Sequence, residues 1–199
     1  MAARGGRGAE RRQGVSRHAV DGRIVSVNVA AKKGVRKEPV ESITLVVEHG
    51  VEGDAHAGPW HRQVSLLANE SIEKMKPACP TVDPGAFGEN ITTEGIVVHE
   101  LPVGARLYAG ETLLEVTQIG KVCHDRCAIF HQAGDCVMPR EGVFAVVREA
   151  GDVAVGDAVK VVSRGDGTCA RSPHDSLAES ESVRAANECR KLEKEAEAR

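Results

Sequence analysis

The chain has 199 residues, a length that fits one domain of ordinary size with extended ends. Its net charge of −3 gives no nucleic-acid-binding footprint, and no apolar run approaches the roughly 20 residues of a membrane helix, so a role on nucleic acid or in a membrane is not expected. Only 3% of the residues are aromatic whereas glycine occurs 21 times, a balance that favours a turn-rich β protein over a helical bundle.

The start of the chain and its cysteine content predict a compartment. No apolar stretch typical of a secretory signal follows Met1, and six cysteines are too few for a disulfide scaffold in a chain of this length. We therefore expect a cytoplasmic protein with free thiols, in which a cysteine cluster indicates catalysis or metal binding. The arginines of residues 1–14 also allow an interpretation as a short transit peptide, although this segment lacks an amphipathic apolar face.

Strands are expected along most of the chain after a Gly/Arg-rich tail, residues 1–20, that is predicted to be disordered. Alternation over residues 23–29 predicts a half-buried strand, with Val25, Val27 and Val29 on its apolar face. Asn69 is expected to cap a short helix that continues to Lys76 and ends before Pro77. Further strands in this half are predicted at residues 43–48, 63–67 and 87–92.

The second half continues the β pattern. Strands are predicted at residues 106–108, 112–118, 143–148 and 158–162, with turns at residues 109–111, 151–152 and 156–157. At least seven short strands with few helices predict a β-barrel or closed sandwich, and a barrel closes both edges most directly. This domain is expected to span residues 21–163. The charged, Ala-rich residues 164–199 are predicted to form a disordered or frayed helical tail, with Cys169 and Cys189 as exposed thiols.

The segment between Thr117 and Phe144 gathers the reactive side chains. It holds three cysteines, two histidines and three basic residues: Cys123, Cys127, Cys136, His124, His131, Lys121, Arg126 and Arg140. Thiolates are nucleophiles and soft-metal ligands, and nearby positive charge lowers the pKa of a thiol. Cys123 and Cys127 are therefore candidate reactive sulfurs, whereas Cys136 more often indicates a core residue.

A zinc-binding structural module is an alternative from another class. Cys123 and Cys127 have the spacing of one ligand pair, and His124, His131 and Cys136 are nearby. No clear second pair follows, so the spacing supplies only half of such a site. His56 and His61 are more typical of surface histidines than of metal ligands.

Several blocks of sequence occur in an order that resembles the MOSC domain. They are VEGDAHAG from Val51, HRQVSLL from His61, PGAFGENITTEGI from Pro84, LPVGARL from Leu101, LEVTQIGKVCHDRCAIF from Leu114 and MPREGVFAVV from Met138. This domain occurs at the C-terminus of molybdenum-cofactor sulfurases and as small stand-alone proteins, and the resemblance covers about residues 22–162. It implies a β-rich barrel and a cysteine that binds the molybdenum of the pterin cofactor or carries sulfur for it.

The resemblance leaves open which cysteine has this role. Molybdenum-binding relatives are similar around Arg126-Cys127, whereas shorter stand-alone relatives more nearly resemble the arrangement Lys121-Val122-Cys123. We expect Cys127 to be the catalytic thiolate and molybdenum ligand, with Cys123 as the alternative, and Lys121 and Arg126 to depress the pKa of the thiol.

Cofactor-binding residues are expected on two sides of that thiol. Arg62, Lys121, Arg126 and Arg140 are candidates for the pterin phosphate, because guanidinium groups bind phosphate oxygens bidentately. Arg62 and Arg140 are equally consistent with plain surface charges. Gly85, Gly88, Glu89 and Asn90 form a loop in which bare backbone can approach a ligand, and Asn90 suits the pterin edge.

Two further readings follow from the resemblance. No pyridoxal phosphate site is recognised, so sulfur would come from a partner, a cysteine desulfurase, or pass to molybdenum cofactor enzymes. The other reading is a molybdenum-dependent reductase of N-hydroxylated compounds, although those relatives carry an additional N-terminal β-barrel segment. Whether the protein turns over a substrate or only carries the cofactor stays open at this point.

Overall fold

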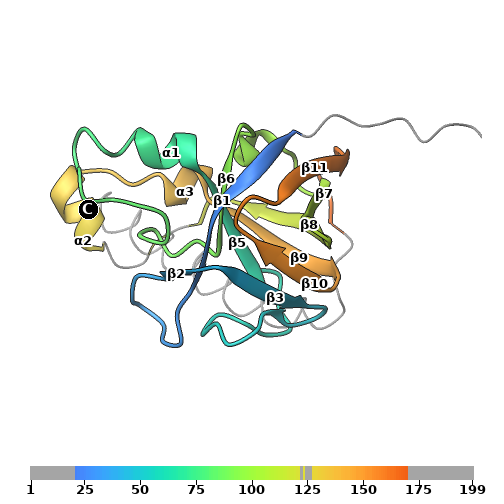
Figure 1. Ribbon diagram of the computed structural model, residues 1–199. Coiled ribbons are helices and arrows are strands. Elements are labelled where there is room, and N and C mark those ends of the chain that lie inside the picture. Colours follow the sequence, from blue (N-terminus) through green and yellow to red (C-terminus); the bar gives the residue numbers. More distant parts are fainter. Residues whose placement is uncertain (1–20, 122, 124–126, 170–199) are drawn as a thin grey trace, which may run out of the picture.

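The computed structural model describes residues 21–121, 123 and 127–169, which form a β-barrel with a helical layer on one side (Figure 1). Seven strands close the barrel in the order β1-β6-β5-β9-β8-β7-β11, and β11 pairs with β1 to complete the ring. Among the described strands, β5 and β6 form the only parallel pair. The strands are β1 Gly22–Val29, β5 Val64–Ala68, β6 Ile91–Glu94, β7 Arg106–Ala109, β8 Thr112–Ile119, β9 Val143–Glu149 and β11 Ala158–Ser163. The predicted barrel is confirmed.

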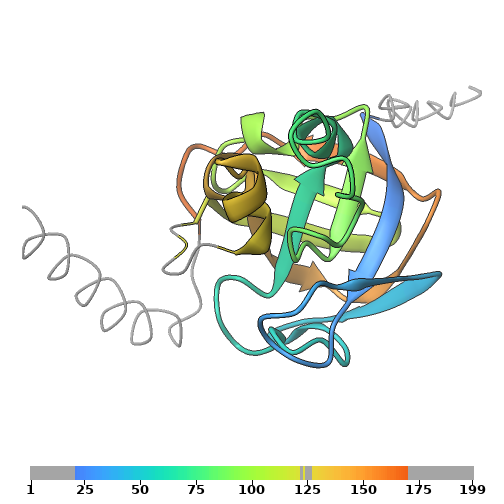
Figure 2. The ribbon, with the colours of Figure 1, turned by 90° about the vertical axis from the view of Figure 1, so that its left-hand side faces the viewer.

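Four other strands lie outside the ring. β2 Glu38–Val40 extends the barrel sheet from β1, and a small second sheet has the order β10-β3-β4, with β3 Ser42–Val46, β4 Gly50–Val51 and β10 Gly151–Ala154. The short helices are α1 Asn69–Glu73, the 3₁₀ helix η1 Val98–Glu100, α2 Ala128–Ala133 and α3 Met138–Glu141. In the view turned by 90°, α1, α2 and α3 lie in front of the barrel (Figure 2). In the described part of the chain, no helix has the length and apolarity to cross a membrane.

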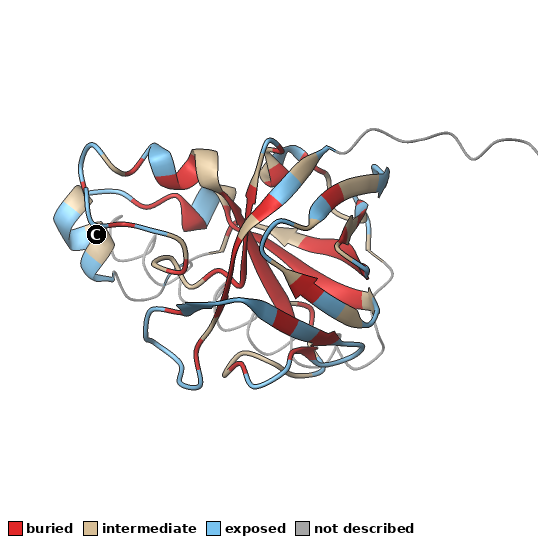
Figure 3. Ribbon diagram, in the orientation of Figure 1, coloured by how far each residue is buried: buried red, intermediate tan, exposed pale blue. Residues whose placement is uncertain are grey.

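Two apolar clusters stabilise this arrangement, one inside the barrel and one beneath the helices (Figure 3). Strand β5 serves both, because Val64, Leu66 and Ala68 belong to the barrel cluster whereas Leu67 belongs to the second cluster with Met138. Successive side chains of a strand point to opposite faces, so β5 is buried on both sides.

Strand β1 is also covered on both sides, which contradicts the predicted half-buried strand. Ser26 and Asn28 are buried, and Ser26 Oγ donates a hydrogen bond to Asn28 Oδ1 at 2.8 Å. Asn90 Nδ2 donates to the Asn28 carbonyl at 3.2 Å from the neighbouring loop. The polar side chains on this face are therefore buried and do not face solvent, and Asn28 Nδ2 is left without a hydrogen-bond partner among the described residues.

Three other local predictions were wrong. Helix α1 begins at Asn69 and ends at Glu73, with Ala68 as N-cap and no side-chain cap, because β5 runs directly into the helix. Residues 87–90 form a turn before β6, in which Gly88 has a φ of 83°. Residues 151–152 begin β10, where Thr44 Oγ1 of β3 donates to Asp152 Oδ1 at 2.7 Å. The turns at residues 109–111 and 156–157 agree with the prediction.

The first residues after the barrel pack against it. Gly167 N donates to the Val103 carbonyl at 3.0 Å, and Cys169 Sγ donates to Glu115 Oε1 at 3.0 Å. Burial and this hydrogen bond raise the pKa of Cys169 to about 11. Cys169 is therefore a half-buried thiol and not an exposed one. The predicted tail at residues 1–20, the rest of the C-terminal tail and Cys189 lie outside the described residues.

Candidate functional site

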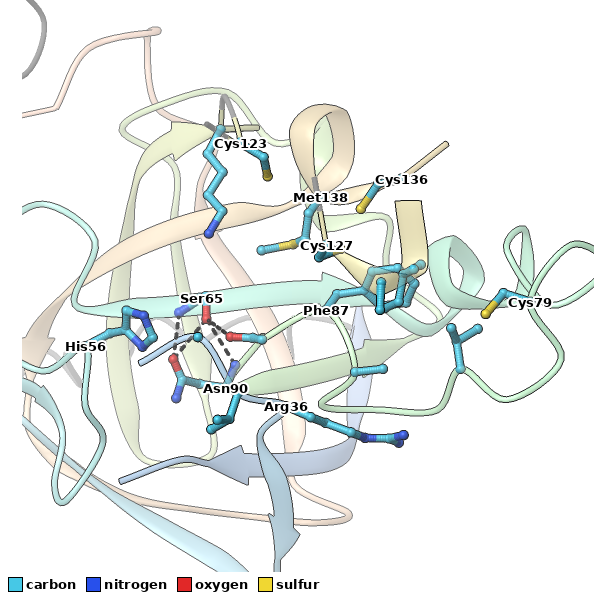
Figure 4. A pocket seen from close by; sticks show the side chains of 18 of the residues that line it. Arg36, His56, Ser65, Cys79, Phe87, Asn90, Cys123, Cys127, Cys136 and Met138 are labelled. Carbon is cyan, nitrogen blue, oxygen red and sulfur yellow. Dashed lines mark hydrogen bonds between the residues drawn. The ribbon is translucent and has the colours of Figure 1, made fainter. Parts of the chain in front are cut away.

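A cavity of about 620 Å³ lies where one side of the barrel meets the helical layer (Figure 4). Strands β5 and β9 contribute Ser65 and Phe144 from the barrel, and α2 and α3 contribute Ile129 and Met138 from the layer. Of the predicted site residues, the cavity is lined by Cys123, Cys127, Arg62, Lys121, Gly88 and Asn90. Side chains that are distant in sequence therefore face one space.

Four cysteines line this cavity. Cys123 and Cys127 are exposed thiols, whereas Cys79 and Cys136 are buried in the second apolar cluster. Burial raises the pKa of the Cys136 thiol, so this sulfur stays protonated at neutral pH and belongs to the wall, as its sequence context predicted. The accessible sulfur nucleophiles among the described cavity residues are thus Cys123 and Cys127.

Cationic side chains line the same cavity. Arg62 is half-buried, with Nε donating to Gln118 Oε1 at 2.9 Å and its guanidinium carbon 5.4 Å from the Phe144 ring centroid and 5.9 Å from that of Trp60. Lys121 Nζ lies 6.0 Å from the Phe144 centroid. No described cavity residue is acidic, and burial lowers the pKa of Arg62. An anionic ligand would relieve that burial cost.

Two predicted cations are not placed at the cavity. Arg140 does not line it, because its guanidinium forms a bidentate pair with Asp135, at 2.9 Å from Nη1 to Oδ1 and 2.7 Å from Nη2 to Oδ2. Hydrogen bonding to Arg140 holds the pKa of Asp135 at about 2. Arg140 thus matches the surface-charge interpretation. Arg126 lies outside the described residues.

The loop from Gly85 to Asn90 shapes the opposite wall. Gly88 reaches the cavity, but Glu89 is fully buried and its carboxylate accepts hydrogen bonds from Gly85 N at 2.6 Å and Phe87 N at 3.2 Å. Burial raises the pKa of Glu89, an effect that these hydrogen bonds oppose. Asn90 Oδ1 accepts from Ser65 Oγ at 2.9 Å, and Asn90 Nδ2 also donates to Asp54 Oδ2 at 3.2 Å. The Asn90 amide therefore positions the wall and is not free for a ligand edge.

Sequence reasoning missed a buried ion pair behind this wall. Lys37 and Asp54 have 2% of their side-chain surface exposed and are in direct contact, Nζ to Oδ2. Asp54 Oδ1 accepts from His56 N at 2.9 Å and lies 3.4 Å from His56 Nδ1, and His56 lines the cavity. Burial alone would raise the pKa of Asp54, but hydrogen bonds from His56 and Lys37 outweigh it and hold this pKa well below its ordinary value. Nothing in the sequence indicates that Lys37 is buried, and His56 was expected to be a surface histidine.

The described residues do not support the zinc interpretation. They contain no group of three His, Cys, Asp or Glu side chains arranged to hold a metal ion. Of the candidate ligands, His124 lies outside the described residues. His61, expected at the surface, is 8% exposed, and its Nε2 lies 3.0 Å from Gln118 Oε1.

Comparison with known proteins gives a family and a fold. The family model described as the MOSC domain matches residues 52–160. Among solved structures, the chain is similar to the YUAD protein of Bacillus subtilis, with 17% identity, a TM-score of 0.62 and coverage of 71% of this chain and 96% of that one. It is also similar to YiiM from Geobacillus stearothermophilus, with 22% identity, a TM-score of 0.57 and coverage of 73% of this chain and 77% of that one. The similarity to YiiM from Escherichia coli has 24% identity, a TM-score of 0.53 and coverage of 71% of this chain and 70% of that one. No curated protein matches the sequence.

Proposed function

The chain belongs to the MOSC domain family, and from this premise we propose that its cavity binds the molybdenum cofactor or carries sulfur for it. Cys127 is the proposed thiolate, with Cys123 as the alternative. One observation carries the proposal: two exposed thiols share a cavity with Arg62 and Lys121.

The cavity residues fit the chemistry of this cofactor. Molybdopterin combines a flat ring system, a dithiolene that holds a soft metal, and a phosphate. A cavity of about 620 Å³ falls within the range of small-ligand pockets. Arg62 and Lys121 supply positive charge for a phosphate, and Cys127 or Cys123 supplies a soft sulfur donor. Gly88, which has no side chain, leaves backbone open to a ring edge.

Each group of the chain then has a distinct task. When bound, the cofactor supplies a redox-active molybdenum centre that accepts a thiolate ligand. Arg62 and Lys121 bind and orient the anionic end, whereas the Gly85–Asn90 loop, held by the Glu89 carboxylate, fixes the wall opposite the thiols. Ile129 and Met138 limit the access of water from the helical side.

Sulfur transfer would use the same thiol. The thiolate of Cys127 attacks the outer sulfur of a persulfide on a cysteine desulfurase, so the new S–S bond forms on Cys127 and the donor leaves as a thiolate. A molybdenum cofactor enzyme would be the receiving partner. Both steps need reduced cysteines, which agrees with a cytoplasmic location for the protein.

The decisive experiment measures molybdenum, pterin and persulfide on the purified native chain. We expect molybdenum and pterin by elemental analysis and mass spectrometry, or an added mass of about 32 Da for one sulfur atom. Cys127→Ser should abolish retention, and Cys169→Ser, outside the cavity, should leave it unchanged. Loss only in Cys123→Ser would move the role to Cys123, and retention in both cavity variants would contradict the proposal.

A molybdenum-dependent reductase of N-hydroxylated compounds is a second candidate. The observation that favours it is the extent of the cavity, which continues past Cys127 to Cys79 and Phe87 and so leaves room for a substrate beside the cofactor. Reduction of a benzamidoxime by the cofactor-loaded protein with an artificial electron donor would test it, and complete inactivity would argue for the carrier role.

A further inference from the structure

Residues 31–36, between β1 and β2, form an exposed loop at the edge of the cavity. All six are exposed, whereas Ala30 before them and Lys37 after them are buried. Half of the loop nevertheless lines the cavity, through Gly34, Val35 and Arg36. Exposed residues that also belong to a cavity wall lie where the cavity meets solvent, so residues 31–36 form part of its rim and are called the rim loop below.

The ends of the rim loop are fixed by one carboxylate. Asp54 Oδ2 accepts a hydrogen bond from Ala30 N at 3.1 Å and contacts Lys37 Nζ. Lys37 N also donates to the Gly85 carbonyl at 3.1 Å. Between these two points, no backbone hydrogen bond connects the rim loop to another described segment. A segment with so few backbone contacts opens at a low free energy, so the loop can move while its ends stay in place.

Space for that movement lies on both faces of the rim loop. Val35 and Arg36 line the cavity of about 620 Å³ and also a second hollow of about 420 Å³. Since the same two residues border both spaces, the loop is a partition between them. Gly34 has a φ of 78°, and a Cβ added there would meet nothing within 4 Å, so the turn of the loop is free of packing contacts.

An exposed ion pair joins the rim loop to a neighbouring loop. Arg36 Nη2 lies 3.9 Å from Asp83 Oδ2, and these side chains are 44% and 65% exposed. Asp83 lies between α1 and β6, next to Val82 of the cavity wall. The Arg36 side chain accordingly extends away from Ser65 and Asn90 (Figure 4). Exposed pairs of this kind contribute little to stability, so Arg36 can exchange Asp83 for a better partner.

We propose that the rim loop is a lid that closes over the cavity when an anionic group binds inside, with Arg36 as the residue that changes partner. In the open state Arg36 pairs with Asp83. An anion bound by Arg62 and Lys121 offers the Arg36 guanidinium a bidentate partner, in a cavity that has no acidic residue among its described lining. Contacts made only in the closed state shift the equilibrium toward that state. This inference rests on the proposed function, because it concerns entry to the same cavity.

Trypsin tests the state of the rim loop, because Lys32 and Lys33 are exposed cleavage sites within it. In the purified chain without added cofactor, we expect saturating inorganic phosphate to slow cleavage at these sites about tenfold, which corresponds to a lid that is closed about 90% of the time. Calorimetry measures phosphate binding, and mass spectrometry quantifies each cleavage. Arg164, an exposed site that lines neither space, should be cleaved at an unchanged rate and controls for any effect of phosphate on trypsin.

Three variants separate closure from binding. Arg36→Gln should still bind phosphate through the other cavity cations but lose the protection at Lys32 and Lys33. Lys33→Gln is the matched control, because it removes the same charge from the same loop without touching the cavity wall, and it should keep the protection at Lys32. Asp83→Asn removes the partner of the open state and should lower the phosphate concentration for half-maximal protection by about threefold, a small change because exposed pairs are weak.

Four results would overturn the lid. These are no phosphate binding, binding that leaves cleavage unchanged, protection of Arg36→Gln equal to that of the native chain, and loss of protection in Lys33→Gln. The last result would show that loop charge alone, and not the position of Arg36, governs cleavage. Phosphate-dependent protection in a native chain that carries no molybdenum, pterin or persulfide would instead contradict the proposed function and support the lid.

Discussion

At the scale of single residues, the carboxylate of Asp54 holds the polar wall of the cavity in place. Its Oδ2 accepts hydrogen bonds from Ala30 N at 3.1 Å and Asn90 Nδ2 at 3.2 Å, besides the contact with Lys37. Burial lowers the pKa of Lys37, and the ion pair with Asp54 opposes that effect. Since both charges have lost their water, each depends on the other.

Removing one member of this pair should therefore be costly. We expect Asp54→Asn to reduce the free energy of unfolding by about 3 kcal/mol, because it leaves the Lys37 ammonium buried without its counter-charge. The double variant Lys37→Met/Asp54→Asn should recover part of this loss. Chemical denaturation followed by circular dichroism measures both, and a double variant less stable than Asp54→Asn would contradict the explanation.

The pH dependence of the free energy of unfolding is a second test of the Lys37–Asp54 pair. The pKa of Asp54 is lowered in the folded state, so its contribution to stability is complete above the unfolded pKa of about 3.9 and is lost as the pH falls below it. The free energy of unfolding of the native chain should thus decrease from about pH 5 toward pH 3, and the slope should be shallower in the double variant.

At the scale of elements, the Gly85–Asn90 loop connects the cavity wall to Lys37, the residue that directly precedes β2. Gly85 has a φ of 86°, and a Cβ added there would overlap the Lys37 carbonyl oxygen, whereas a Cβ at Gly88, with a φ of 83°, would meet nothing within 4 Å. Lys37 N also donates to the Gly85 carbonyl at 3.1 Å. The loop can approach the Lys37 backbone only because residue 85 has no side chain.

The two glycines should consequently respond differently to the same change. Gly88→Ala should cost roughly 1–2 kcal/mol, the strain of a left-handed backbone. Gly85→Ala should cost about 3 kcal/mol, because the steric overlap adds to that strain. Denaturation midpoints test this difference, and equal destabilisation would show that the close approach at Gly85 has no energetic weight.

At the scale of the whole molecule, the helical layer is built on the barrel. Leu66 and Leu67 are neighbours in β5, both fully buried, yet the first contacts the barrel cluster and the second contacts the cluster beneath the helices. Phe144 of β9 likewise joins the second cluster. Because the same strands supply both clusters, the layer and the barrel should unfold as one cooperative unit.

Leu66→Ala and Leu67→Ala test that cooperativity. Each should shift a single unfolding transition to lower denaturant, with a loss of about 2–5 kcal/mol that is typical of buried leucine truncations. An independent helical layer would give another outcome. Leu67→Ala would then produce a separate early transition and leave the main one in place.

Much of this architecture was predictable because strand alternation and glycine turns are local signals. Six of the seven barrel strands and the hairpin around Gly110 were expected, whereas the strand predicted at residues 87–92 overlaps β6 only at Ile91 and Thr92. Helices α2 and α3 were missed because each is shorter than two turns and leaves little periodicity to detect. Burial of Lys37 and the pairing of Arg140 with Asp135 depend on which partners the fold provides, so no pattern along the chain reveals them.

Trp60 gives the molecule a built-in optical reporter. It is the single tryptophan of the chain, its Nε1 donates to the His56 carbonyl at 2.8 Å, and its ring lies beneath Arg62 at the cavity. All indole emission therefore originates at one edge of this space, with no background from elsewhere. Ligand entry can be followed in unlabelled protein, and a library of compounds can be screened by fluorescence before any physiological substrate is known.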